Sequence, residues 1–271
     1  MADTDNRQHS LESSRLAPDG ALQNVLMTSL VALVSALFVS TAAVLLQPRY
    51  AAQQSALRQA SMANLIESIP SLSSLVLASD ADSLQTQLID LDSGCRATEV
   101  SAAEFDARTA ENDPEQSRAL TTEDGDAQAM LKRRSDLEKV HLLFDKEQLQ
   151  MAILPVHGPG YQSTLYAWLV LDKDLSSIIA LSVTEHAETP GIGSRVEDPA
   201  WQRQWTDKQL LDESGELVIR VVKNADDTPY QVDAISGATR TSLGVSNMVR
   251  FWTGPLGFGP FLELQRRGEP C

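Results

Sequence analysis

The stretch QVDAISGATRTSLGV, Gln231–Val245, joins a strand-like run to a helix-like run. β-Branched residues mark its first part, small residues fill its middle, and four side chains in the middle and second part carry hydroxyls. An apolar stripe from Val245 to Trp252 predicts a helix from about Thr241 onward. The first N–H groups of a helix lack intrahelical partners, so a junction of this kind can seat a phosphate.

The hydroxyls allow two interpretations, and spacing alone favours the simpler one. In the first, Thr241 or Ser242 caps a helix that begins near Leu243. In the second, the small pair Gly237–Ala238 lets another molecule approach the backbone, and Thr239 presents a hydroxyl at the same place. Helix caps of this type are common, so the residues by themselves favour the cap.

Composition excludes several classes of function. The chain has 271 residues, 42% of them apolar, which suffices for a substantial core. Its 22 basic residues stand against 37 acidic ones, and a net charge of −15 argues against a nucleic-acid partner. Two cysteines, Cys95 and Cys271, provide neither a disulfide framework nor a Cys-x-x-Cys metal or cluster site.

One uncharged stretch, residues 21–47, predicts a membrane anchor. Its core from Val25 to Leu46 would rise about 33 Å as a helix, enough to cross a bilayer. A buried core helix and a cleaved signal peptide are the alternatives, but the apolar part of a signal peptide is shorter. Two arginines before the stretch are matched by two shortly after it, so charge does not decide the orientation.

The remaining chain divides by composition. A polar tail precedes the anchor, a run of helix formers follows it as a stalk helix, and then comes an acidic part with a loop-like, solvated insertion at about Asp80 to Arg134. A folded domain and a short tail complete the chain. The expected boundaries are 1–20, 21–47, 48–75, 76–145, 146–265 and 266–271.

Strand signals cluster in the second half of the chain. Trp201 and Trp205 lie four residues apart in a short helical pattern from Pro199 to Lys208 and would share a face. The sequence therefore predicts an α+β domain on an antiparallel sheet. The expected strands are Leu149–Val156, Tyr161–Leu171, Ile178–Glu185 and Leu217–Val222.

Several common sites are missing from the sequence. There is no Gly-Lys dipeptide for a P-loop, no G-x-G-x-x-G fingerprint and no G-x-S-x-G nucleophile elbow. The four histidines are scattered, without helix or hairpin spacing for a metal. We therefore assign no catalytic residue and no metal ligand.

The segment Asp233–Thr239, DAISGAT, resembles the D-x-x-[S/T]-G-A-[T/S] signal of the covalent FMN-binding domain family. In that family, a flavin transferase joins the phosphate of FMN to the last residue of the signal. The resemblance implies that Thr239 carries the cofactor and that Asp233 belongs to the recognition signal. The resemblance also implies that the turn residues Ser236, Gly237 and Ala238 contact the cofactor. It makes Thr241 and Ser242 candidates for hydrogen bonds to the phosphate or to the helix start.

A second segment, EHAETPGIG at Glu185–Gly193, resembles the E-T-P-G-[L/I]-G loop of the same family, which lies against the flavin. Proline fixes the chain, glycines permit close approach to a flat ring, and isoleucine can cover a face of it. The cofactor-binding residues that this resemblance implies are Glu188, Thr189, Pro190, Gly191, Ile192 and Gly193.

Two branches of the family fit the chain. EDPAWQRQW at Glu197–Trp205 and GPLGFGPFL at Gly254–Leu262 resemble the C subunits of sodium-translocating NADH:quinone reductases, whereas the G subunits of Rnf-type complexes are the alternative. A membrane-anchored binding module without flavin is a further alternative, from a different class.

The C-subunit resemblance implies a single-pass protein of the bacterial inner membrane, with a cytoplasmic tail and a periplasmic FMN-binding domain at 146–265. The covalent FMN would relay electrons from NADH toward ubiquinone in a sodium-pumping complex. The other subunits of that complex, and transiently a flavin transferase, would be its partners. Little activity is expected of the protein in isolation.

Overall fold

The computed structural model describes residues 23–41, 84–121, 131–269 and 271 of the chain. Gln23–Thr41 is a helix of 19 residues with a mean hydropathy of 1.8 and no buried side chains, long and apolar enough to cross a membrane. It lies inside the stretch expected to be an anchor. The expected tail at 1–20 and stalk helix at 48–75 fall outside the described residues.

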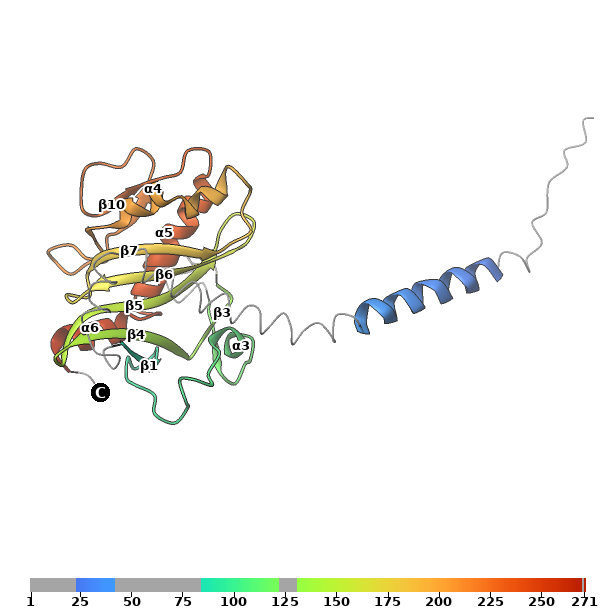
Figure 1. Ribbon diagram of the computed structural model, residues 1–271, viewed down its shortest axis with the longest axis horizontal. Helices are drawn as coiled ribbons and strands as arrows, with labels where there is room; N and C mark the ends of the chain where they lie inside the picture. Colours follow the sequence, from blue (N-terminus) through green and yellow to red (C-terminus); the bar gives the residue numbers. More distant parts are fainter. Residues whose placement is uncertain (1–22, 42–83, 122–130, 270) are drawn as a thin grey trace, which may run out of the picture. The chain divides into compact units, whose positions relative to one another are not determined.

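A six-stranded antiparallel sheet with the strand order β1-β4-β5-β6-β7-β8 forms the centre of the domain (Figure 1). Consecutive hairpins build most of it, since β4 pairs with β5, β5 with β6 and β6 with β7, all antiparallel. The strands are β1 (Leu84–Asp90), β4 (Leu137–Asp145), β5 (Gln148–Pro159), β6 (Thr164–Asp172), β7 (Ser177–Glu185) and β8 (Lys208–Gln209).

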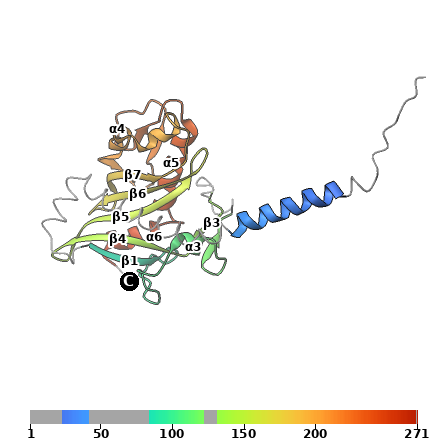
Figure 2. The same cartoon turned by 45° about the vertical axis from the view of Figure 1, so that its right-hand side comes forward.

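Two helices near the carboxyl end, α5 (Thr239–Thr253) and α6 (Gly259–Arg267), pack on one face of the sheet (Figures 1 and 2). Helix α5 buries the stripe expected from its sequence, including Val245 and Trp252, each 0% exposed. These side chains join alternate residues of β5 and β6, such as Leu154 and Leu169, in one hydrophobic core. The amphipathic pattern of the helix thus fixes which face it turns to the sheet.

Smaller elements surround this core. The parallel pair β9 (Arg220–Val222) and β10 (Gln231–Asp233) leads into α5, and the antiparallel pair β2 (Ser117–Ala119) and β3 (Arg133–Ser135) lies in the amino-terminal half of the domain. Among the described residues of the domain there are also four short helical segments: α3 (Ala107–Glu111), η4 (Gly193–Glu197), α4 (Pro199–Gln202) and η5 (Arg203–Trp205).

The α+β class with an antiparallel sheet is confirmed, and three of the expected strands correspond to β5, β6 and β7. Of the expected strand Leu217–Val222, only Arg220–Val222 forms a strand, β9, which pairs with β10 outside the main sheet. Trp201 and Trp205 do share a face, with ring centroids 6.0 Å apart.

The acidic region differs from the expected solvated insertion. Within it, β1 pairs along its whole length with β4 and adds a strand to the main sheet. Ile89 of β1 is 1% exposed and contributes to the main core, while Leu88, on the opposite side of the strand, packs with Phe105. Scattered apolar residues among acidic and polar ones are thus enough to hold an edge strand when a neighbouring strand supplies the partners.

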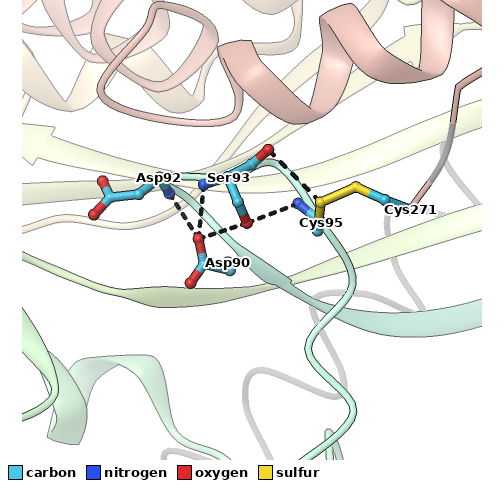
Figure 3. Close-up of a disulfide and its surroundings, with 5 residues drawn as sticks. All are labelled: Asp90, Asp92, Ser93, Cys95 and Cys271. Atoms are coloured by element: carbon cyan, nitrogen blue, oxygen red, sulfur yellow. Dashed lines mark hydrogen bonds between the residues drawn. A yellow bond between two sulfur atoms is a disulfide. The ribbon is translucent and has the colours of Figure 1, made fainter.

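A disulfide joins Cys95, in the loop after β1, to Cys271 (Figure 3). The backbone N–H of Arg96 also donates a hydrogen bond to the carbonyl of Cys271, at 3.3 Å. On the other side of the loop, the carboxylate of Asp90 accepts hydrogen bonds from the backbone and hydroxyl of Ser93. The carboxyl-terminal segment is therefore tied to the sheet edge, a connection that two cysteines 176 residues apart did not suggest.

Candidate functional site

A cavity of about 420 Å³ opens at the start of α5. Three segments that are distant in sequence form its walls: the turn between β5 and β6, the glycine loop after β7, and the first turn of α5 with the residues before it. The lining residues are Tyr161, Thr189, Ile192, Gly193, Gly237, Ala238, Thr239, Arg240 and Thr241.

Helix α5 begins at Thr239, so the interpretation of Thr241 or Ser242 as a cap is wrong. Ala238 occupies the cap position, and no side chain accepts a hydrogen bond from this end of the helix. Gly237 has a φ of +82° and makes the turn that aims the helix start at the cavity. The N–H groups of the first helical turn therefore face the cavity region without a side-chain cap.

The three hydroxyls at this helix start differ in their surroundings. The Thr241 hydroxyl is buried and donates a hydrogen bond of 2.7 Å to Glu188. The Ser242 hydroxyl is also buried and accepts a hydrogen bond of 3.0 Å from the backbone N–H of Ile235. Thr239 is exposed and lines the cavity. Of these three residues, only Thr239 is exposed to solvent.

Glu188 holds the three walls of the cavity together. Its side chain is buried, and one carboxylate oxygen accepts hydrogen bonds from the backbone N–H groups of Gln162 and Ser163, at 2.9 and 3.1 Å. The other oxygen accepts the N–H of Tyr161 at 3.2 Å and the hydroxyl of Thr241. One carboxylate thus joins the β5–β6 turn, the glycine loop and α5.

These hydrogen bonds also fix the charge of Glu188. Burial by itself would raise the pKa of this carboxyl, but the donors from Thr241, Gln162, Ser163 and Tyr161 outweigh burial and lower the pKa below its usual value. The group is therefore a carboxylate at neutral pH. It faces backbone donors and is not among the residues that line the cavity, so we assign it a positioning role.

Position 193 requires glycine because Glu188 lies against it. A Cβ atom on Gly193 would lie 2.8 Å from a Glu188 carboxylate oxygen and 3.0 Å from the Thr241 hydroxyl oxygen. The first distance is shorter than real contacts of a Cβ atom and the second is at the tight limit, so a larger residue would push the glycine loop away from α5. The loop therefore approaches the helix start closely only with glycine at this position.

The cavity has the features that a flavin nucleotide requires. Its helix end offers N–H groups and a positive dipole to a phosphate, beside the exposed hydroxyl of Thr239. At its rim, Ile192 and Tyr161 are 47% and 55% exposed and present apolar surface to a flat ring. Anion-binding and ring-covering groups thus lie within one cavity, which fits FMN.

The structure brings most of the expected site residues together. Thr189, Ile192, Gly193, Gly237, Ala238, Thr239 and Thr241 line the cavity. Asp233 is exposed at the end of β10. The expected residues that do not line the cavity are Ser236, Glu188, Pro190, Gly191 and Ser242.

Two lining residues, Tyr161 and Arg240, were not expected. Tyr161 was assigned to a strand, and the structure instead places it in the β5–β6 turn, since β6 begins at Thr164. Its position directly after a Gly-Pro-Gly sequence was the available sign of a turn. Arg240 follows the last residue of the FMN signal, and nothing in the sequence marked it as a site residue.

Comparison with known proteins agrees with this geometry. Residues 160–254 match the FMN-binding domain family, a span that contains every residue lining the cavity. The chain is 37% identical to the C subunit of the Na(+)-translocating NADH-quinone reductase of Vibrio alginolyticus, over 88% of this chain and 93% of the relative. The corresponding protein of Pseudomonas aeruginosa is 35% identical over 93% of this chain and 98% of the relative.

The fold matches as well. The crystal structure of Shewanella oneidensis NqrC superposes with a TM-score of 0.64 and 32% identity, over 72% of this chain and 88% of that structure. These matches favour the C subunits over the Rnf-type alternative. The chain belongs to the family formed by the C subunits of the Na(+)-translocating NADH-quinone reductases.

Proposed function

We propose that this protein is a membrane-anchored electron carrier that holds FMN covalently on Thr239. It passes electrons from NADH toward ubiquinone within a sodium-pumping quinone reductase. The observation that carries the proposal is the exposed Thr239 hydroxyl at an uncapped helix end, beside the glycine loop and inside the matched FMN-binding domain. The family to which the chain belongs supports the reaction.

The chain's own residues would bind and orient the cofactor, while FMN supplies the electron-transfer chemistry. Thr239 would carry the phosphoester, and the N–H groups of the first turn of α5 would bind the phosphate oxygens. Ile192 and Gly193 of the glycine loop, which line the cavity, would contact the ring system. Glu188 keeps this loop and the helix start in register through its hydrogen bonds.

We further propose that the domain faces the periplasm. The helix Gln23–Thr41 supports a single membrane anchor. The disulfide between Cys95 and Cys271 supports an oxidising compartment, since such bonds are rare in the cytosol. A covalent cofactor suits this side of the membrane, because a dissociating FMN would be lost there.

The partners that follow from this proposal are the other subunits of the quinone reductase and, during maturation, a flavin transferase. Asp233 and Ser236 are both exposed, which supports a recognition signal that an enzyme reaches from solvent. Thr239 lies at the end of that signal and is equally open.

The experiment is co-expression of the full chain with a flavin transferase, followed by in-gel fluorescence of the denatured protein. The wild type is expected to fluoresce, Thr239→Ser to retain fluorescence because it keeps the hydroxyl, and Thr239→Ala to lose it. Thr206→Ala, an exposed threonine away from the cavity, is the control and should fluoresce. A fluorescent Thr239→Ala protein would refute the attachment site, and a colourless wild type would favour a binding module without flavin.

A further inference from the structure

Arg240 is the charged side chain of the cavity lining. The other lining residues are glycines, alanine, threonines, isoleucine and tyrosine. Its guanidinium carbon lies 5.4 Å from the ring centroid of Tyr161, across the cavity wall formed by α5 and the β5–β6 turn. This distance is within the range of a cation–π contact, which holds a guanidinium over an aromatic face.

No carboxylate of the described residues pairs with Arg240. The ion pairs of other arginines, such as Arg108 with Glu185, lie elsewhere, and the nearby carboxylate of Glu188 is occupied by five hydrogen-bond donors. Arg240 itself is exposed to solvent. Its charge is therefore available to a ligand of the cavity.

The anionic part of the proposed ligand would lie beside this cation. A phosphoester on Thr239 would carry one negative charge, and Arg240 is the next residue of the same helix start and also lines the cavity. The guanidinium presents several N–H donors that suit phosphate oxygens. The helix end alone supplies only a partial positive charge, and the full charge of Arg240 at the cavity rim would add to the attraction for a phosphate.

We propose that Arg240 binds the phosphate of the FMN attached to Thr239, and that Tyr161 holds the guanidinium in place for this contact. The inference rests on the function proposed above, since it requires FMN on Thr239. It adds a residue outside the FMN signal, at the position between Thr239 and Thr241, and it assigns a role to the exposed tyrosine at the cavity rim.

The test is ³¹P NMR of the full-length flavinylated protein in detergent. The wild type is compared with Arg240→Gln, Arg240→Lys and Tyr161→Ala, and Arg203→Gln, an exposed arginine outside the cavity lining, is the matched control. We expect the phosphoester resonance to shift in Arg240→Gln and, in the same direction but less, in Tyr161→Ala. It should stay at the wild-type position in Arg203→Gln. In Arg240→Lys the resonance should lie closer to the wild-type position than in Arg240→Gln, because lysine keeps the positive charge.

Intact mass separates the two levels of the proposal. A wild type without FMN would refute the proposed function itself. FMN on Thr239 with the same resonance in the wild type and in Arg240→Gln would refute only the role of Arg240. If Arg240→Gln accepts no FMN, attachment of FMN to Arg240→Lys would support a role for the positive charge. Loss of FMN attachment in both variants would overturn that role.

Discussion

Replacing Glu188 with glutamine tests how the cavity walls are held together. The amide has the shape of the carboxylate but lacks its charge, and one of its two acceptors becomes an NH₂ donor. If the amide oxygen takes the place of the oxygen that faces Gln162 and Ser163, the NH₂ group faces the N–H of Tyr161 and the hydroxyl of Thr241. The threonine hydroxyl can turn to accept, but the N–H of Tyr161 loses its acceptor.

The expected loss follows from the number of donors. A hydrogen bond to a charged group contributes about 1.5–3 kcal/mol and a neutral one about 1 kcal/mol, so each retained bond weakens by about 1 kcal/mol. Three donors from Gln162 and Ser163 share one oxygen of Glu188. The Glu188→Gln variant should therefore lose at least about 3 kcal/mol of unfolding free energy, because the unpaired N–H of Tyr161 adds to the loss from these three weakened bonds.

The assay is urea unfolding of the full chain in detergent, followed by tryptophan fluorescence. Glu213→Gln, an exposed glutamate in a turn, serves as the control and should change the unfolding free energy by less than about 0.5 kcal/mol. If Glu188→Gln unfolds at the same urea concentration as Glu213→Gln, the carboxylate does not hold the walls and the reasoning is wrong.

The difference in unfolding free energy between wild type and Glu188→Gln should also depend on pH. Because the folded state lowers the pKa of Glu188, its contribution is present above the unfolded value near 4.5 and is lost as pH falls through the folded pKa. The difference in unfolding free energy between wild type and Glu188→Gln should therefore be constant near neutral pH and shrink below about pH 4.5. A difference that grew on acidification would contradict the assigned charge.

Two further predictions concern stability away from the cavity. Cys95→Ser should lower the unfolding free energy by up to about 5 kcal/mol, because the bond to Cys271 closes a long loop in the unfolded chain. Urea titrations of the wild type and of Cys95→Ser, with and without a reductant, measure this loss. Equal urea midpoints for the oxidised wild type and Cys95→Ser would contradict the prediction. Burial raises the pKa of Glu138 to about 8, so the wild type should lose up to about 1.4 kcal/mol per pH unit from its unfolded value near 4.5 up to about pH 8, and Glu138→Gln should lack this slope. Parallel stability curves for wild type and Glu138→Gln would refute the buried carboxyl as its source.

Local patterns in the sequence predicted the parts of the fold that depend on them. The apolar runs of β5, β6 and β7 are bounded by turn residues, and the apolar stripe of α5 has helical spacing. Strand β1 was not predicted, because its sequence LQTQLID is half polar and its stability comes from pairing with β4, about 50 residues away in the chain. The disulfide likewise depends on a distant contact that no spacing rule supplies.

The site shows the same division. The resemblance of the signal that ends at Thr239 located the expected attachment residue, and the structure places that residue in a cavity with the glycine loop. Spacing alone led to the wrong helix start, because Thr241 and Ser242 resemble caps until their hydroxyls are seen bonded to Glu188 and to the backbone of Ile235. The inward direction of Glu188 is a long-range property of three segments and is invisible in the sequence.

The proposed function depends above all on the attachment of FMN to Thr239. The most direct test is tandem mass spectrometry of the peptide that contains this residue, from protein extracted from membranes of cells with a flavin transferase. We expect the peptide to carry the mass of one FMN minus water, with the fragment ions placing it on Thr239. An adduct on Thr241 or Ser242, or an unmodified peptide, would show that Thr239 is not the attachment site.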